Sequence, residues 1–305
     1  MNDWAHDAVA VIGRAELKRL SGRSDAHGVL QLGRHLALLF VTGWLVHLGL
    51  GTVWLWPAML VHGVVLVFLF APLHETIHRT AFHSRALNDA VAFAIGVLLV
   101  LPREYFRAFH FAHHRFTQEA IDPELAAPKP ASALQFFWSI PGMPFWIAGV
   151  RGLVQRAAGV LNEQIYATDR VRRSVIEEAR WVLAIYAVAL VGSIAAGSAL
   201  LLWYWVIPAL LGQPVLRLYL MAEHSGCPRS TDMLENSRTT YTNALVRFLA
   251  WNMPFHAEHH AWPSIPFHAL PAANALVRDK LRTTAPGYAA ALGEIWRAMR
   301  AGQAL

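Results

Sequence analysis

The sequence predicts an all-α integral membrane protein with four transmembrane helices arranged in two hairpins. Its 305 residues are 55% hydrophobic and only 15% charged, and the mean hydropathy is +0.35. These values are typical of a membrane protein rather than of a soluble domain. A second observation points the same way, because lysine and arginine are absent from two long stretches of the chain. A third is that eight of the sixteen histidines are concentrated in three short clusters, one of them at the end of the first stretch.

The apolar segments have the lengths that membrane spans require. An uncharged run of about 20 residues crosses a hydrocarbon layer of about 30 Å at about 1.5 Å per residue. Pro57 and the Gly197–Ser198 pair interrupt the apolar stretches and predict tight turns within each hairpin. Four spans are therefore expected, at about residues 36–57, 58–79, 181–197 and 199–222.

The placement of basic residues predicts the orientation. No lysine or arginine occurs in 36–78 or 181–216, so all 26 lie elsewhere. Because cytoplasmic flanks of spans carry the excess of basic residues, both termini and the middle segment are expected on the cytoplasmic side, most simply of a bacterial inner membrane. This topology accounts for the net charge of +6, so no nucleic-acid partner is expected. The expected division is an N-terminal cytoplasmic segment (1–35), a membrane domain (36–275) with a helical cap (80–180 and 223–275), and a C-terminal cytoplasmic helix or tail (276–305).

Two segments of the middle region are apolar but too short to span. Ala90–Leu101 and Leu134–Val150 are expected to be interfacial or re-entrant pieces, the second with a break in its SIPGMP sequence at 139–144. The N-terminal tail lacks the order of a signal peptide and is expected to stay on the mature protein. The single cysteine, Cys227, excludes an intrachain disulfide and a four-cysteine metal site.

Eight of the sixteen histidines fall in the clusters HETIH (74–78), HFAHH (110–114) and HAEHH (256–260). On a helix, residues three and four apart share a face, so each cluster can direct its imidazoles to one point. One transition-metal ion takes about four to six ligands, and eight imidazoles therefore favour two ions. The predicted cap thus carries a histidine-rich di-metal site. The candidate ligands are His74, His78, His110, His113, His114, His256, His259 and His260.

Further residues beside these clusters are candidates for supporting roles. His224, in MAEHSGCP after the fourth span, is a ninth candidate ligand. Three glutamates adjoin the histidines and can bridge metals or, more commonly, orient ring N–H groups; they are Glu75, Glu223 and Glu258. Three arginines near the second cluster are candidates for binding a substrate head group, or for general contact with lipid head groups; they are Arg103, Arg107 and Arg115.

Two other chemistries remain open from these patterns. HETIH matches H-E-x-x-H, in which two histidines hold zinc and the glutamate activates water, as in an intramembrane zinc metalloprotease. Such an enzyme needs about three protein ligands, which leaves the other two clusters unexplained. A metal transporter would place its histidines along a path through the bilayer, whereas these clusters lie beyond the spans at one interface.

The order of HxxxH after the second span, HxxHH in the middle segment and HxxHH near the carboxyl end resembles the membrane fatty acid desaturase superfamily, over roughly residues 36–275. The stretch NMPFHAEHHAWPSIPFHALP (252–271) is similar to the last box of its bacterial members, and EHSG (223–226) resembles the extra histidine box of the alkane hydroxylase branch. The resemblance implies two iron ions held by these histidines, with O2 as co-substrate. It also implies attack on an unactivated C–H bond of a fatty-acid or lipid chain, which no acidic or basic side chain can achieve alone.

Desaturation is the expected reaction, and hydroxylation or alkene-forming decarboxylation of a fatty acid is the alternative on the same scaffold. The resemblance and the lone cysteine together imply an external electron donor. This donor is expected to be a ferredoxin, a rubredoxin or a cytochrome with its reductase.

Overall fold

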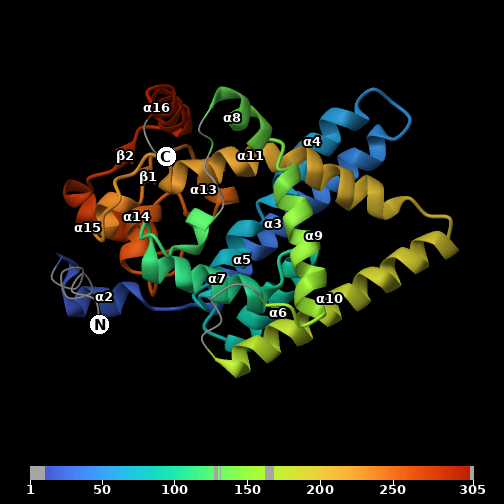
Figure 1. The fold of residues 1–305 in the computed structure, drawn as a ribbon, viewed down its shortest axis with the longest axis horizontal. Helices are drawn as coiled ribbons and strands as arrows, with labels where there is room; N and C mark the ends of the chain where they lie inside the picture. The colour runs from blue at the N-terminus through green and yellow to red at the C-terminus, as the bar shows by residue number, and fades with distance from the viewer. Residues whose placement is uncertain (1–10, 127–129, 131, 162–167, 303–305) are drawn as a thin grey trace.

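The fold is a set of long apolar helices joined at one end to a group of short helices (Figure 1). The computed structural model describes residues 11–126, 130, 132–161 and 168–302. The long helices extend to one side of the molecule, and the C-terminal helices gather with the N-terminal helix at the other side (Figure 1). The candidate site lies where the two parts meet.

Among the described residues, four helical segments are long and apolar enough to cross a membrane, as expected. The first is α3, the second combines α4 and α5, the third is α10, and the fourth combines the five-residue π-helical turn η2 with α11. Their outward side chains are apolar; Phe40 on α3 and Val188 on α10 are 75% and 73% exposed. Such exposure is costly in water and is expected for a lipid-facing surface. The bounds are α3 (Asp25–Gly49), α4 (Leu55–Val67), α5 (Phe70–Ile77), α10 (Asp169–Ala195), η2 (Leu202–Val206) and α11 (Ile207–His224).

The ends of these helices differ from the expectation. α3 and α10 begin well before residues 36 and 181, because Ser24 and Thr168 accept hydrogen bonds from backbone N–H groups in the first turn. The first hairpin turn lies at residues 50–54 and not at Pro57. Pro57 instead occupies the first turn of α4, where its missing N–H has no intrahelical partner to lose.

The helices of the first predicted hairpin pack side by side, and α11 packs against the same helix, α4. The contact of α4 with α11 is close at Gly63 and Gly212, where an added Cβ at Gly63 would lie 1.9 Å from the carbonyl oxygen of Pro208. The second pair is different, because α10 and α11 diverge from their connecting turn (Figure 1). In the part of the chain that the structure describes, α3 and α4 thus pack against each other, whereas α10 and α11 do not pack in this way.

The segment between the second and third spans contains two successive pairs of helices. α6 (Arg85–Leu98) and α7 (Arg103–Phe116) meet at 101°. The hydroxyl of Tyr186 and the indole N–H of Trp205 donate to the carbonyls of Val97 and Leu98 at the end of α6. After the 3-10 turn η1 (Pro123–Ala126) come α8 (Ala133–Ser139) and α9 (Met143–Ala157), separated at Gly142, whose φ of +72° favours glycine. The two short apolar pieces are thus helices, and the predicted SIPGMP break is confirmed.

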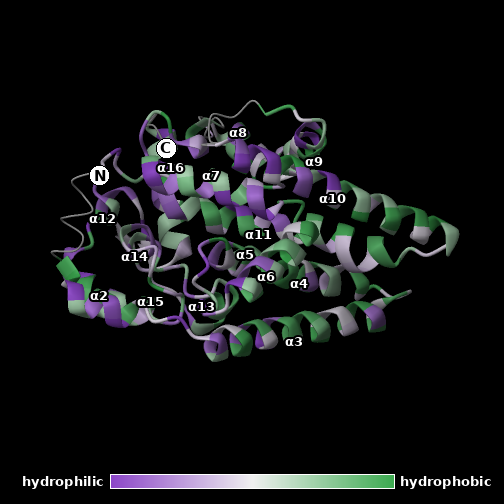
Figure 2. Cartoon of the chain, turned by 90° about the horizontal axis from the view of Figure 1, so that it is seen from below, coloured by the Kyte–Doolittle hydropathy of each residue, from purple (hydrophilic) through white to green (hydrophobic). Residues whose placement is uncertain are grey.

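The C-terminal part consists of short elements around one parallel β-pair, in which Thr239 pairs with Thr284. The N-terminal helix α2 (Arg14–Leu20) lies beside this part, since Lys280 donates to the carbonyl of Val11. Hydrophilic residues are frequent here, whereas hydrophobic residues dominate the long helices (Figure 2). The elements are α12 (Met233–Asn236), β1 (Thr239–Thr240), α13 (Ala244–Leu249), α14 (His256–Ala261), α15 (Leu270–Val277), η3 (Arg278–Lys280), β2 (Thr284–Ala285) and α16 (Tyr288–Arg300).

Candidate metal centre

Nine histidines from four helices converge where the apolar helices meet the short ones. α5 supplies His74 and ends at His78. α7 carries three histidines on one face, α11 ends at His224, and α14 carries the last three. The structure therefore brings together every histidine that the sequence singled out, including the ninth candidate.

The nine histidines divide into two groups. In one group, ligand nitrogens of His74, His78, His110, His114 and His259 lie within 4.8 Å of one another. In the other, those of His113, His224 and His260 do so. His256 adjoins the second group, because its Nε2 lies 2.9 Å from Nε2 of His224. The groups touch through the stacked rings of His114 and His260, whose centroids are 4.1 Å apart.

The distances between imidazole nitrogens fit shared metal ions. Two nitrogens each about 2.1 Å from one ion and at a right angle to each other lie about 3 Å apart. The Nε2 atoms of His110 and His114 are 2.9 Å apart, and those of His259 and His114 are 3.1 Å apart. In the second group, Nε2 of His113 and Nε2 of His224 are also 3.1 Å apart.

The protonation state of the histidines suits metal binding. Burial lowers the pKa of His259 and His260 well below the usual histidine value, and the neighbouring imidazoles lower it further. Neutral imidazole is the form that binds a metal. Within the described residues, Nε2 of His78 and Nε2 of His260 are buried without a hydrogen-bond partner. Such atoms are costly to bury unless something binds them, and a cation between the rings would do so.

The chain turns sharply after the first cluster. Arg79 adopts a left-handed φ of +58° directly after His78. The hydroxyl of Thr80 donates to the carboxylate of Glu75 at 2.6 Å, and Arg107 donates from Nε to the carbonyl of Ile77 at 3.1 Å. These contacts end α5 at the histidines and fix His78 against the next helix.

Asp122 contacts one of the clustered histidines and was not singled out by the sequence analysis. Its carboxylate accepts a hydrogen bond from Nδ1 of His113 at 3.0 Å and from the backbone N–H groups of Gln118 and Glu124 at 2.9 Å. A carboxylate on Nδ1 leaves Nε2 of the same ring as the ligand atom and fixes the ring's orientation. The only signal in the sequence is an acidic residue eight positions beyond the cluster's last histidine, which is too general to single out.

The second group has further supports that spacing did not reveal. Thr117 donates from its hydroxyl to the carbonyl of His113, and the same oxygen lies 3.2 Å from Nδ1 of His260. The side chain of Gln118 donates to the carbonyl of His224 at 2.9 Å. Nδ1 of His224 lies 3.3 Å from the carbonyl oxygen of Asn236. Backbone and side-chain groups thus surround rings that come from three different helices.

The three glutamates beside the clusters do not act alike. Glu223 lies 3.5 Å from Nδ1 of His256, in a position to orient that ring. Glu258 makes its described contacts elsewhere: it accepts hydrogen bonds from Thr239 and Asn274 and so joins α14 to β1 and α15. Adjacency in sequence misled here, because a residue between two histidines on a helix points to another face.

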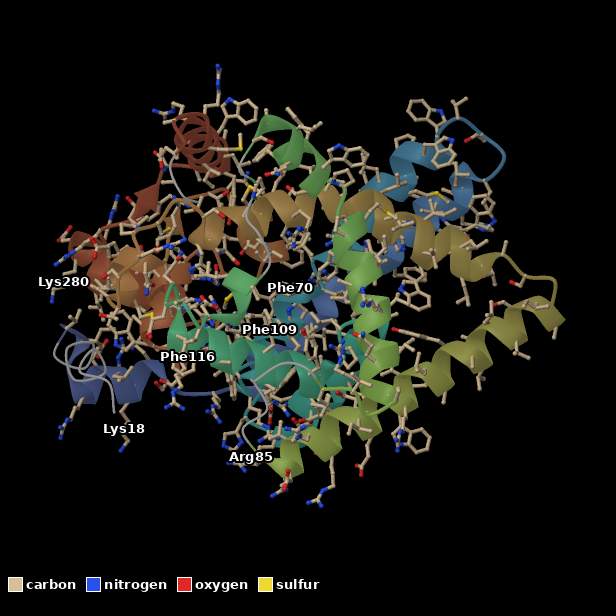
Figure 3. All side chains as sticks on the ribbon, in the orientation of Figure 1. Lys18, Phe70, Arg85, Phe109, Phe116 and Lys280 are labelled. Atoms are coloured by element: carbon tan, nitrogen blue, oxygen red, sulfur yellow. The ribbon has the colours of Figure 1, made fainter. Side chains whose placement is uncertain are left out.

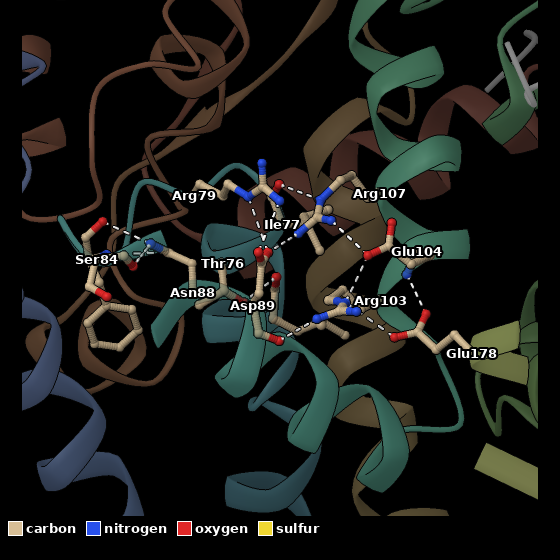
Figure 4. Close-up of polar contacts among 12 residues, drawn as sticks. Thr76, Ile77, Arg79, Ser84, Asn88, Asp89, Arg103, Glu104, Arg107 and Glu178 are labelled. Atoms are coloured by element: carbon tan, nitrogen blue, oxygen red, sulfur yellow. Dashed lines mark hydrogen bonds and ion pairs between the residues drawn. The ribbon is translucent and has the colours of Figure 1, made fainter. Parts of the chain in front are cut away.

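The arginines near the second cluster also differ from the expectation. Arg107 pairs with Asp89 at 2.8 Å and with Glu104 at 3.0 Å, and Arg103 pairs with Glu104 and Glu178 (Figure 4). The two arginines hold α6, α7 and α10 together and do not line the cavity described below. Arg115 is exposed, with its guanidinium over the ring of Phe116.

A cavity of about 1210 Å³ reaches the histidines from one side. It is formed by α7, α9, α11 and the segment around η1, and its walls are mostly apolar and aromatic. Phe70, Phe109 and Phe116 belong to these walls and lie towards the middle of the molecule (Figure 3). Its inner end is bounded by His74, His110, His113, His224 and His256. The volume exceeds what a single small molecule needs and suits a long apolar chain.

Comparison with known proteins identifies the family. The sequence profile described as fatty acid desaturase matches residues 51–291, which is most of the chain. The chain belongs to the fatty acid desaturase family. It is an oxidoreductase of the fatty acid desaturase type, and the family and the apolar helices together place it in a membrane.

Individual relatives in this family are distant. The chain is 26% identical over 255 residues to the dihydrorhizobitoxine desaturase of Bradyrhizobium elkanii, covering 77% of this chain and 70% of that protein. It is 25% identical over 223 residues to the sphingolipid delta(4)-desaturase of Komagataella phaffii, covering 69% of this chain and 58% of that protein. A delta(12) fatty acid desaturase of Mortierella isabellina is 28% identical over only 78 residues, which are 25% of this chain and 20% of that protein. These desaturases differ in substrate, so the family does not fix the substrate of this chain.

Proposed function

We propose that the protein is an O2-dependent, non-haem di-iron desaturase that acts on the unactivated alkyl chain of a fatty acid or acyl lipid. The observation that carries the proposal is the pair of adjacent histidine groups at the inner end of an apolar cavity. In this proposal, His74, His78, His110, His114 and His259 hold one ion. His113, His224 and His260, with His256, hold the other.

Imidazole ligands suit iron, zinc, copper and nickel, and hard cations that prefer oxygen ligands are poorly matched to them. Among these metals, membership of the fatty acid desaturase family supports iron. When bound, two irons would supply the oxygen activation that removal of hydrogen from an alkyl chain requires. The protein's own contribution is positional. Asp122 and Glu223 orient the rings of His113 and His256, and the aromatic walls of the cavity exclude water and hold the chain against the histidine end.

The alternative reactions on this scaffold are hydroxylation and alkene-forming decarboxylation. These reactions differ from desaturation in which atom of the substrate lies nearest the metals. Shifts of about 1 Å in the position of the substrate are enough to change this, and the cavity walls set that position. An intramembrane zinc protease is the weaker alternative. It needs about three protein ligands, whereas nine histidines converge here.

We further propose that both termini and the metal centre are cytoplasmic and that electrons arrive from a separate ferredoxin, rubredoxin or cytochrome with its reductase. The absence of lysine and arginine from 36–78 and 181–216 supports the orientation. The lone cysteine, buried at Cys227, supports an external donor, because a cysteine-ligated cluster needs about four.

The reaction is tested by the lipids and hydrocarbons of cells that express the protein. Desaturation predicts new unsaturated acyl chains, hydroxylation predicts hydroxylated chains, and decarboxylation predicts alkenes one carbon shorter. The control is His259→Ala, which removes a proposed ligand outside every span and is expected to abolish turnover while leaving membrane insertion intact. Wild-type products from a metal-free His259→Ala protein would overturn the proposal.

A further inference from the structure

The lining of the cavity carries charges of both signs. Its acidic residues adjoin the histidines: Asp122 is bonded to His113, Glu223 faces His256, and Glu124 lies 3.9 Å from Nε2 of His113. Its arginines lie on α9 and α11 and are Arg151, Arg156 and Arg217. The rest of the lining is dominated by apolar and aromatic side chains. A ligand that fits these walls and the arginines has an anionic head and a long apolar tail.

Arg217 is the arginine whose position needs explanation. It lies on α11 within the fourth apolar segment, seven residues before His224. A charged side chain in such a segment is costly, faces a polar cavity or partner, and commonly marks a substrate path. Arg217 is half-buried and lines the cavity, with its guanidinium 5.9 Å from the ring centroid of Phe145.

The described part of the chain supplies no ion-pair partner to Arg217 within 4 Å. Glu124, which also lines the cavity, attracts it electrostatically but does not form an ion pair with it. By contrast, Arg103 and Arg107 are each paired with carboxylates, and Arg156 lies over the ring of Tyr105 at 3.6 Å. Of the four arginines Arg103, Arg107, Arg156 and Arg217, only Arg217 lies inside a spanning segment, and its guanidinium lines the cavity where a ligand can reach it.

We propose that Arg217 binds the anionic head group of the substrate inside the cavity, so that the substrate is an amphiphile with a free carboxylate or phosphate. This inference rests on the proposed function, since it takes the cavity to be the substrate site. The rise of about 1.5 Å per residue places Arg217 about 10 Å from His224 along α11. Anchoring the head there sets which carbon of the tail reaches the histidines. Arg151, exposed on the same cavity, adds a second positive charge.

The test is a binding measurement that needs neither O2 nor a reductant. Radiolabelled palmitate is bound to the full-length protein in mild detergent, and unlabelled palmitate, methyl palmitate and 1-palmitoyl-glycerol-3-phosphate compete for it. The variants are Arg217→Gln and Arg217→Lys. The matched control is Arg173→Gln, an exposed arginine on α10 that does not line the cavity.

We expect Arg217→Gln to weaken palmitate binding about tenfold or more, because a charge-assisted hydrogen bond is lost. Arg217→Lys should retain part of the affinity, since it keeps the charge but not the two-pronged geometry, and Arg173→Gln should bind normally. Methyl palmitate should compete poorly with the wild type. If 1-palmitoyl-glycerol-3-phosphate competes more strongly than unlabelled palmitate, the result also supports the anion site and identifies the head group as a phosphate.

Equal competition by methyl palmitate and palmitate in the wild type would overturn the inference, as would unchanged palmitate binding by Arg217→Gln. If Arg217→Gln fails to fold, competition by palmitate and by methyl palmitate is still compared in the wild type and in Arg217→Lys, and this comparison tests whether the site binds an anion. Binding is measured without turnover, so the two proposals can fail separately. A protein that binds palmitate through Arg217 but produces no modified acyl chain would contradict the proposed function and would leave this binding site supported.

Discussion

Asp122 shows how much of a metal centre depends on residues that are not ligands. It holds Nδ1 of His113 and two backbone N–H groups, and it is 4% exposed. Asp122→Asn preserves the shape but removes the charge that fixes the ring. We expect metal affinity to fall about 10- to 100-fold.

This effect of Asp122→Asn is measured by titrating the purified protein with a metal chelator and following bound iron. Glu119→Gln is the matched control, since Glu119 lies in the same turn but outside the site. Equal iron retention by Asp122→Asn and Glu119→Gln would show that the carboxylate does not orient a ligand.

His268 provides a pH-dependent contribution to stability away from the metal centre. Burial, with a contribution from His27, lowers the pKa of His268 to about 4, and the two rings stack at 4.4 Å. Above about pH 6.5 the ring is neutral in both the folded and unfolded states. Between about pH 6.5 and 4 the unfolded state binds a proton that the folded state does not, so stability falls on acidification.

The full pKa shift of His268 would correspond to a loss of about 3 kcal/mol in the free energy of unfolding on acidification. Because the ring is partly exposed, we expect a loss of about 1 kcal/mol. The midpoint of thermal unfolding in detergent at about pH 7.5 and about pH 5 measures it. His268→Gln should lose less stability on acidification than the wild type, whereas His83→Gln, at an exposed site, should behave like the wild type. Identical acid sensitivity in all three proteins would refute the assignment.

Residue by residue, spacing predicted which histidines converge better than it predicted the residues that contact them. The i, i+3, i+4 pattern put the histidines of α7 on one face because helix geometry alone decides that. The same geometry does not determine whether Glu258 faces a ring or Thr239. It also does not determine that Arg107 pairs with Asp89 and Arg103 with Glu178, because these contacts join different helices.

Among the elements, the crossing of α4 and α11 aligns the two halves of the centre. α4 leads into α5 with His74, and α11 ends at His224, so the contact of Gly63 with Gly212 sets the distance between ligands. A Cβ at Gly212 would lie 2.2 Å from the backbone carbonyl carbon of Gly63. Backbone cannot yield as a flexible side chain can, and small residues are what allow helices to approach closely in a membrane.

Gly212→Ala is therefore expected to destabilise the protein by about 1 to 3 kcal/mol and to release iron. Gly192→Ala on α10 is the control, because nothing lies within 4 Å of a Cβ there and alanine favours a helix. Thermal unfolding and bound iron are compared for the two variants. A Gly212→Ala protein as stable and as iron-rich as Gly192→Ala would show that the crossing is not tight.

The length of the apolar segments predicted which parts of the chain form spanning helices, but it did not predict the residues at which these helices begin and end. The caps at Ser24 and Thr168 extend α3 and α10 into polar sequence, and Pro57 is accommodated within a first turn rather than forming the hairpin. The divergence of α10 from α11 could not be predicted either, because α10 packs against α7 and α9 while α11 packs against α4, and these contacts join distant segments.

For the whole molecule, the four apolar helices and the convergence of nine histidines follow from composition, periodicity and spacing. The cavity does not, since α7, α9 and α11 form it from residues more than a hundred positions apart. This is why the arginines that line the cavity escaped the sequence analysis, while Arg103 and Arg107 near a histidine cluster attracted attention. Family membership agrees with the overall arrangement and leaves the substrate to the cavity.

The central claim is that the two histidine groups hold two redox-active irons. The most direct test is the metal content of the full-length protein purified in mild detergent, measured by elemental analysis and normalised to protein. We predict close to two irons per chain, and a large loss of iron in His259→Ala. One zinc per chain without iron would contradict the claim and favour hydrolysis at the HETIH motif.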